Sequence, residues 1–291
     1  FKTVPDTTEG WCEEDDGPNF LPTPAVGLKV PGGELPPLPD SGEAKYGHLS
    51  DKGETVTITR FAEQMNINEQ TLINDQLGLV MKILGGPEGY GVKASNVRPG
   101  LVYSIIKANA AMADTIVIFH ADHGNLQTGS ALTLATLGTA IAKMQLAVET
   151  GANGKSAMLS LRPTHILIPP TLFGAAGQVL SDTLGGIAAV QVGVENPYAA
   201  FGIQRVPEAR LELTTSHTRT GAVLAGSSSD WFLVSADAPP ILVRYLSATG
   251  RVPRTRTEPL RNGKWGINID VSFDLAATAI RHQSIVKSTA G

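Results

Sequence analysis

The first 42 residues constrain the fold more than any other part of the sequence, because prolines recur there too closely for a continuous helix or an inner strand. A proline ring fixes φ and removes the backbone N–H that helices and central strands use. The segment also carries apolar side chains such as Trp11, Phe20 and Leu28, so it does not have the composition of a polar tail. We therefore expect residues 1–42 to form an extended arm that docks on another surface. The prolines of this arm are Pro5, Pro18, Pro22, Pro24, Pro31, Pro36, Pro37 and Pro39.

A second extended element is predicted from the alternating, β-branched run at residues 55–61, which follows a turn signal at residues 50–53. We interpret residues 43–68 as a long β-hairpin. Neither of its strands carries enough apolar side chains to form a core, and an isolated hairpin is only marginally stable in water. The hairpin is therefore expected to lie on another surface.

Apolar side chains at helical spacing predict three helices further along the chain. Asn68 can cap the first, which runs to residue 84, where a Gly-Gly-Pro sequence ends it. The second is expected over residues 99–111, with its proline in the first turn. The third is expected over residues 132–148 and carries a single apolar stripe, which indicates core packing rather than a ligand site.

Further strands are predicted in the second half of the chain. Residues 165–168 form a strand that leads into a helix at about residues 172–184, and His165 is expected to face solvent or a neighbour. Residues 263–287 alternate between apolar and polar side chains, as an antiparallel strand with one buried face would. We expect that strand to pair beside the apolar run near Ile116.

The loop after that apolar run holds the strongest candidate for chemistry. His120, Asp122 and His123 are residue types that hold zinc or iron, and a soluble metal-dependent hydrolase that uses them is one hypothesis. However, all three lie on one short turn, and no Cys or Glu follows at a ligand-like spacing. The next helix offers no acid on its apolar face either. We therefore expect no catalytic, cofactor-binding or metal site in the chain.

Two other patterns also lack the context that their chemistry needs. Residues 149–156 end like a phosphate-binding loop, but Glu149 stands where the first glycine belongs and no strand comes before it. We expect a helix-ending turn there. The chain has no Gly-x-Ser-x-Gly sequence, and residues 226–230 are a small polar loop, which argues against a serine hydrolase.

Composition narrows the functional classes. Charged residues make up 17% of the chain, below the roughly 25% of ordinary soluble domains, so other copies are expected to cover much of its surface. Cys12 is the single cysteine, which excludes an intrachain disulfide and suits a reducing compartment. No apolar run approaches the roughly 18 residues that span a bilayer.

The net charge of -4 and the pI of about 5.9 argue against a dedicated nucleic-acid binder. Arginines concentrate in one region only, where prolines, Thr255 and Glu258 separate them. Solvated charge or salt bridges between subunits explain this cluster at least as well as nucleic acid does. Its members are Arg244, Arg251, Arg254, Arg256 and Arg261.

Several elements, taken in their order, resemble a known family. The apolar run that ends at Phe119 leads through a loop with the sequence His-Gly-Asn-Leu into a long amphipathic helix. Together with four other segments, this element resembles the major head proteins of tailed bacteriophages, particularly the Mu-like major head subunit group, over about residues 43–288. Those segments are residues 73–78 (Ile-Asn-Asp-Gln-Leu-Gly), 163–172, 231–237 and 262–287.

The resemblance implies the Hong Kong 97-type capsid fold, which is an α+β architecture. It implies an N-terminal arm at residues 1–42 that runs across the neighbouring subunit, and an extended hairpin loop at residues 43–68 that clasps it. A peripheral domain at residues 69–154, an axial domain at residues 155–235 and the return strands of the peripheral domain at residues 236–291 complete the division. The resemblance also implies that the His-Gly-Asn element is structural.

The function implied by the resemblance is structural, not enzymatic. Copies would assemble into hexamers and pentamers of an icosahedral phage head that encloses double-stranded DNA, which they would contact only loosely and without sequence preference. Portal and decoration proteins are further candidate partners, and no membrane is expected. The protein would assemble in the cytoplasm of the bacterial host and reside in the virion. An encapsulin-like compartment shell is the alternative with the same fold.

Two covalent events are considered for such a protein. The chain begins at Phe1 rather than Met, as after removal of a scaffolding segment by a prohead protease, and a trimmed terminus explains this equally well. Some relatives cross-link a lysine to an asparagine. Lys45 and Lys52 are conceivable donors, and Asn262 and Asn268 conceivable acceptors, but the resemblance carries over no residues for this reaction.

Overall fold

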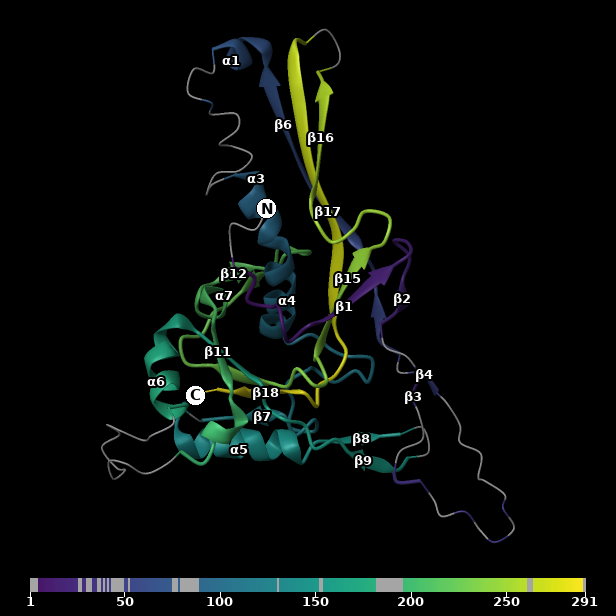
Figure 1. Cartoon of the computed structure of the whole chain (residues 1–291), viewed down its shortest axis with the longest axis vertical. Helices are drawn as coiled ribbons and strands as arrows, with labels where there is room; N and C mark the ends of the chain where they lie inside the picture. Colours follow the sequence, from purple (N-terminus) through teal and green to yellow (C-terminus); the bar gives the residue numbers. More distant parts are fainter. Residues whose placement is uncertain are drawn as a thin grey trace.

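Two five-stranded β-sheets with helices packed beside them make up the body of the computed structural model (Figure 1). The mixture of helices and strands confirms the expected α+β class. No helix of the described chain is both long and apolar enough to cross a membrane. The structure describes residues 5–25, 28–29, 33–35, 38, 40, 42, 50–51, 53–74, 78, 89–129, 131–151, 154–181, 196–260 and 264–289.

The first sheet is built around β17 (Gly266–Ala279), a strand of 14 residues. Its first part pairs antiparallel with both β6 (Thr59–Asn68) and β16 (Arg254–Pro259), which therefore lie on opposite edges. Its last part pairs with β15 (Ile241–Leu246), and β15 in turn pairs parallel with β1 (Glu13–Gly17). The strands β6, β16 and β17 extend beyond the body as a three-stranded ribbon at the top of Figure 1.

The inner strands of the second sheet are buried on both faces. Its central strands are β10 (His165–Ile168) and β14 (Trp231–Val234), whose side chains alternate between two hydrophobic clusters. This double burial explains why both strands are continuously apolar in the sequence. The strand order is β11 (Gln204–Pro207), β10, β14, β18 (Ile285–Ser288) and β7 (Leu126–Gln127).

Helices cover both sheets. α4 (Val97–Ala108) follows α3 (Tyr90–Ser95) and packs on β17 and β15. α5 (Leu134–Gln145) and α6 (Phe173–Val179) contribute to the cluster on the opposite face of the second sheet. α5 thus packs with β10 and β14, which lie in the expected axial domain, although the helix itself was expected in the peripheral domain.

Short elements complete the fold. They are α1 (Glu69–Ile73), the 3-10 turns η1 (Pro170–Leu172) and η2 (Ala199–Phe201), α7 (Ala209–Glu212), and the strand pairs β2 (Thr23–Pro24) with β5 (Thr55–Val56), β3 (Leu28–Lys29) with β4 (Ser50–Asp51), β8 (Val148–Thr150) with β9 (Ser156–Met158), and β12 (Thr215–Ser216) with β13 (Val223–Leu224).

The hairpin predicted over residues 43–68 is wrong in its pairing. The strand at 59–68 pairs with β17, not with the residues just before it. A hairpin does project from the body, but β2 with β5 and β3 with β4 form it, so it begins about twenty residues earlier (Figure 1). We call these four strands the projecting hairpin. Alternation predicts a strand but says nothing of its partner, which is why the expected pairing failed.

The expected arm also differs from the structure. Residues 5–25 fold back on their own chain, where Trp11 is fully buried and β1 adds an edge strand to the first sheet. The indole N–H donates to the carbonyl oxygen of Thr7 at 2.8 Å, and the ring meets Tyr103 edge to face at 6.2 Å. For these residues, the expectation of an arm that lies over a neighbouring subunit is wrong.

Several local predictions are confirmed with adjusted bounds. Asn68 caps α1 by accepting a hydrogen bond from the backbone N–H of Thr71, and α1 ends at Ile73; residues 75–77 and 79–84 of the predicted helix lie outside the described residues. The helix predicted over residues 99–111 is α4. The one predicted over 132–148 is α5, which a capping box between Thr133 and Thr136 opens.

Three other expectations are wrong. Residues 149–151 and 154–156 belong to the hairpin of β8 and β9, not to a helix-ending turn. The C-terminal strand β17 pairs with β6, β15 and β16 instead of the run near Ile116. His165 is buried, because Thr164 and the strands on both sides enclose it.

Candidate assembly surfaces and histidine cluster

The acidic strand β1 is fastened to its own chain by ion pairs. All four of its carboxylates face an arginine, and two of these arginines belong to the basic cluster seen in the sequence. Salt bridges between subunits are therefore the wrong explanation for Arg244 and Arg251. The pairs are Glu13–Arg281 at 2.9 Å, Glu14–Arg98 at 2.5 Å, Glu14–Arg251 at 2.8 Å, Asp15–Arg244 at 2.5 Å and Asp16–Arg251 at 2.9 Å.

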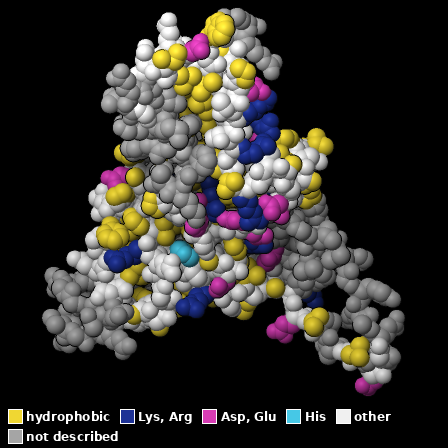
Figure 2. Space-filling view, turned by 45° about the horizontal axis from the view of Figure 1, so that its top comes forward, with side chains coloured by type: hydrophobic (Ala, Val, Ile, Leu, Met, Phe, Trp, Pro, Cys, Tyr) yellow, Lys and Arg dark blue, Asp and Glu magenta, His cyan; other side chains and the backbone are white. Residues whose placement is uncertain are grey.

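Two more arginines of that cluster are also paired within the chain. Arg254 contacts the buried carboxylate of Asp274 at 3.3 Å, and Arg256 contacts Glu258. Arg261 lies outside the described residues. Figure 2 shows basic and acidic side chains interleaved across the middle of one face. Such interleaving offers no continuous basic surface for a phosphate backbone.

The buried side chain of Arg98 binds the N-terminal segment. Arg98 in α4 contacts Asp6 at 3.1 Å and donates to the hydroxyl of Thr8 at 3.0 Å and to that of Tyr245 at 3.1 Å. Burial raises the pKa of Tyr245 to about 12, so its hydroxyl stays protonated. The same burial raises the pKa of the neighbouring Cys12 thiol, which disfavours its reactive thiolate form.

The projecting hairpin is anchored at its base by Arg244. This guanidinium donates to the hydroxyl of Thr23 at 2.6 Å and to the carbonyl oxygen of Pro24 at 3.0 Å, in addition to its pair with β1. Gly17 lies against it so closely that a Cβ there would come within 2.9 Å of the arginine Cδ. Farther out, Leu35 is 96% exposed and Leu38 is 64% exposed, so the hairpin presents apolar side chains that its own chain does not cover.

The far end of the ribbon presents a second uncovered apolar surface. Trp265 is 77% exposed just before β17, and Ile73 at the end of α1 is 75% exposed. The two elements are tied together, because the backbone N–H of Glu69 donates to the carbonyl oxygen of Trp265 at 3.1 Å. Figure 2 shows apolar side chains gathered at this end of the molecule.

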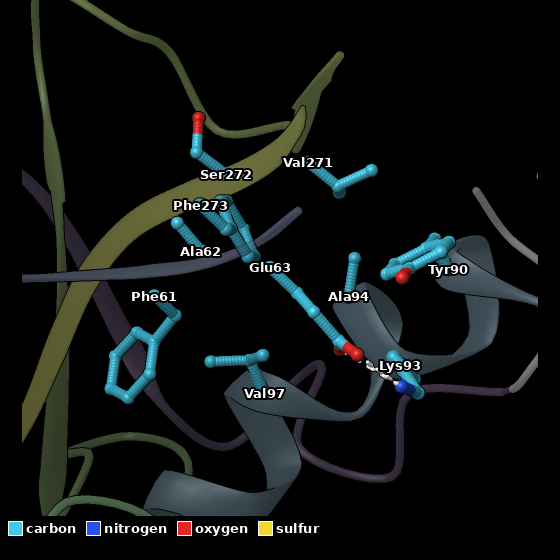
Figure 3. A pocket seen from close by; sticks show the side chains of 10 residues that line it. All are labelled: Phe61, Ala62, Glu63, Tyr90, Lys93, Ala94, Val97, Val271, Ser272 and Phe273. Atoms are coloured by element: carbon cyan, nitrogen blue, oxygen red, sulfur yellow. Dashed lines mark hydrogen bonds and ion pairs between the residues drawn. The ribbon is translucent and has the colours of Figure 1, made fainter. Parts of the chain in front are cut away.

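A small groove lies between the ribbon and the start of α4 (Figure 3). Phe61, Val97 and Phe273 line its apolar part, and the ion pair between Glu63 and Lys93, at 2.7 Å, closes one side. The hydrogen bond that Lys93 donates to the carboxylate of Glu63 raises the pKa of Lys93. The cavity volume is about 120 Å³, below the roughly 300–1,000 Å³ of sites for small-molecule ligands.

The predicted metal-ligand candidates do not converge. His120 and Asp122 face each other at 3.3 Å on the exposed side of the loop, away from His123. Next to them Gly124 adopts φ +68, which favours glycine, and the buried side chain of Asn125 donates to the carbonyl oxygens of Ile118 and His282. This loop geometry agrees with a structural role for the His-Gly-Asn element.

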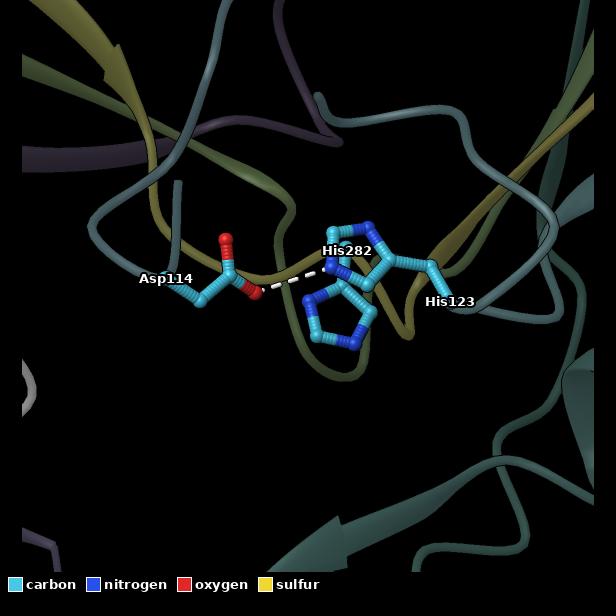
Figure 4. Close-up of side chains that lie close together, drawn as sticks. All are labelled: Asp114, His123 and His282. Atoms are coloured by element: carbon cyan, nitrogen blue, oxygen red, sulfur yellow. Dashed lines mark hydrogen bonds and ion pairs between the residues drawn. The ribbon is translucent and has the colours of Figure 1, made fainter. Parts of the chain in front are cut away.

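His123 instead joins two residues that sequence reasoning missed. Its Nε2 lies 2.9 Å from Oδ2 of Asp114, and its Nδ1 lies 3.0 Å from the carbonyl oxygen of Ile118. The ring of His282 stacks on it at 3.7 Å between centroids and 7° between planes (Figure 4). Burial would raise the pKa of Asp114, but the hydrogen bonds from His123 and from the backbone of Ile116 outweigh this effect and lower it.

This histidine cluster, made of Asp114, His123 and His282, lies where the two sheets are joined. Asp114 and His123 belong to the connection from α4 to β7, and His282 belongs to the connection from β17 to β18. No sequence motif joins residues so far apart. The position of Asp114 shortly before the predicted loop is the one signal in the sequence that points to part of the cluster.

Of the conceivable cross-linking residues, the structure describes Asn268 only. It is buried within β17, and its Nδ2 donates to Asp270 at 2.8 Å. An acceptor for a lysine of another subunit would have to be accessible, so Asn268 does not fit that role. Lys45, Lys52 and Asn262 lie outside the described residues.

Comparisons with known proteins identify the fold. The mature capsid of bacteriophage PhiM1 matches with a TM-score of 0.60 and 11% identity over 99% of this chain and 87% of that one. The capsid of cyanophage P-SCSP1u matches with a TM-score of 0.57 and 10% identity over 96% and 86%. The capsid of Ralstonia phage GP4 gives 0.56 and 10% over 97% and 88%. No curated protein matches the sequence.

The sequence itself matches the model of a protein family described as phage capsid protein, over residues 53–288. This family model does not separate the Mu-like group, so that finer resemblance is not confirmed. The family and the fold are those of structural proteins, and the hypothesis of a metal-dependent hydrolase that uses His120, Asp122 and His123 is wrong on both geometry and family. The chain is a member of the phage capsid protein family, with a Hong Kong 97-type fold, and its place is in the shell of a virion.

Proposed function

We propose that copies of this chain assemble into hexamers and pentamers of an icosahedral head that encloses double-stranded DNA. The observation that carries the proposal is the position of the exposed apolar side chains. Leu35 and Leu38 on the projecting hairpin and Trp265 on the ribbon lie at extremities that no part of the described chain covers. Apolar side chains at such places favour association, because burial against a neighbour removes them from water.

A third extremity supports the same proposal. Leu146, at the end of α5, is 77% exposed, and Met158, in the hairpin of β8 and β9, is 84% exposed. Apolar ends that point in different directions suit a subunit with several neighbours, as in a closed shell, better than a simple dimer with one interface.

DNA contact is proposed to be loose. The net charge is -4, and Arg244, Arg251 and Arg254 of the basic cluster form ion pairs with carboxylates. A protein of this kind releases few counterions and holds phosphates weakly, so packaged DNA can move past it. Portal and decoration proteins remain proposed partners, and the host cytoplasm remains the proposed place of assembly.

We also keep the division into arm, hairpin, peripheral and axial domains as a proposal, with two adjustments suggested by the packing. α5 would join the axial domain because its apolar stripe shares a cluster with β10 and β14. Residues 5–25 would belong to the peripheral domain because they pair with β15.

The decisive experiment is assembly of the purified chain followed by negative-stain microscopy. We expect closed shells from the wild type and from A248D, which places a carboxylate at an exposed position away from the extremities. The double variant L35D/L38D should remain as small oligomers or single chains, because charged ends cannot be buried against a neighbour. A wild type that stays monomeric at high concentration would refute the proposal.

The same particles test the encapsulin-like alternative. Shells recovered from infected cells should protect double-stranded DNA from nuclease. Particles that hold an enzyme cargo and no DNA would favour the compartment instead.

A further inference from the structure

We propose that the histidine cluster of Asp114, His123 and His282 binds a divalent transition-metal ion of the zinc class. One oxygen of the carboxylate and one nitrogen of each imidazole lie within 4.8 Å of one another. Imidazole nitrogen and carboxylate oxygen form the usual donor set of three-ligand zinc sites, which leave the fourth position to water.

The orientation of His123 is already that of a metal ligand. A carbonyl oxygen only accepts hydrogen bonds, so Nδ1 must donate to Ile118, which directs Nε2 toward the carboxylate of Asp114. A metal-binding imidazole typically donates its other N–H to a carbonyl oxygen in this way. Asn125 donates to the same carbonyl at 2.8 Å and holds it in place.

His282 must rotate to take part. In stacked rings the in-plane lone pairs run parallel, so both imidazoles can bind one ion only if His282 turns about its side-chain torsions. It lines a cavity of about 210 Å³ that also contains Asp114, Glu54 and Glu149. The cavity gives the ring room to turn and the ion a way in, and its three carboxylates favour a cation.

The position of the site indicates what the ion would do. The ligands belong to two separate connections, one from α4 to β7 and one from β17 to β18, so the ion would fix one connection to the other. It would add stability without any chemistry, in keeping with a protein that is not an enzyme.

The test uses the full-length purified chain and zinc chloride in isothermal titration, with metal content measured after dialysis. At pH 7.5 we expect one zinc ion per chain, and no binding of magnesium or calcium, which prefer all-oxygen sites. D114N and H282Q should weaken zinc binding at least about tenfold, as loss of even an outer-shell partner does. H120Q is the matched control and should bind as the wild type does.

Failure of zinc to bind, unchanged affinity in both D114N and H282Q, or an equal loss in H120Q would each overturn the proposal. The side chain of Asp114 is 42% exposed and His282 is only partly buried, so these variants should fold. Circular dichroism of each variant checks this point. Because the readout is zinc binding, it is independent of whether shells form.

Discussion

Replacing Trp11 by alanine tests whether the N-terminal segment belongs to its own chain. The side chain is fully buried among residues of α4 and both sheets. A tryptophan buries about 150–250 Å², and about 25 cal/mol per Å² gives roughly 4–6 kcal/mol as an upper limit. Large-to-small changes of this kind in protein cores cost about 3–5 kcal/mol. We therefore expect W11A to lower the free energy of unfolding by about 4 kcal/mol.

The assay is urea unfolding of unassembled chains at low concentration, followed by tryptophan-independent circular dichroism. F20A is the matched control in the same segment, because Phe20 is 42% exposed and its ring centroid lies 5.4 Å from the guanidinium of Arg60. Its cost should stay near or below about 1 kcal/mol. If W11A also lowered the free energy of unfolding by less than about 1 kcal/mol, the intrachain packing described above would be refuted, and Trp11 would instead pack on another subunit.

Two further predictions concern buried titratable groups. Burial raises the pKa of the Cys12 thiol, so the native chain should react with a disulfide reagent far more slowly than the chain unfolded in urea, and equal rates would contradict its burial. Burial lowers the pKa of His165, although a hydrogen bond with Gln204 opposes this. The unfolded state then binds more protons below about pH 6.5, so stability falls as the pH drops through that range. Urea midpoints at pH 7.5 and 5.5 should show a smaller fall for H165Q than for the wild type, whereas H120Q should keep the full fall.

Much of the fold follows from local sequence patterns. The short apolar run at 165–168 predicted a strand, because a strand covered on both faces needs no polar side. The three-four spacing from Leu134 to Met144 predicted α5, and Asn68 predicted the start of α1. In each case the deciding information lies within a few residues of the element.

What the sequence did not predict is which elements meet. β6 pairs with β17 and β1 pairs with β15 across about two hundred residues, and no turn signal links such partners. The histidine cluster was not predicted for the same reason, since His282 stacks on His123 only because two connections pack together. Contacts of this kind depend on topology, which periodicity does not specify.

Trp11 illustrates a subtler limit. The prolines around it correctly excluded a central strand, and β1 is indeed an edge strand. Apolar residues in such a segment indicate that it docks, but they do not reveal whether the surface belongs to the same chain or to another. Here the side chain fills a gap beside Tyr103 in its own core, at least for the described part of the segment.

Arg244 links the projecting hairpin to the first sheet, so it helps to transmit force between them. It belongs to β15, which is hydrogen-bonded along both edges, and its guanidinium grips the base of the projecting hairpin together with the acidic edge strand. Tension from a neighbour that pulls on the hairpin reaches the body through the chain on both sides of the hairpin, which continues into β1 and β6, and through this side chain, so the hydrogen bonds of the first sheet share it. In a shell of such subunits, the contacts between subunits should therefore break before the subunits unfold.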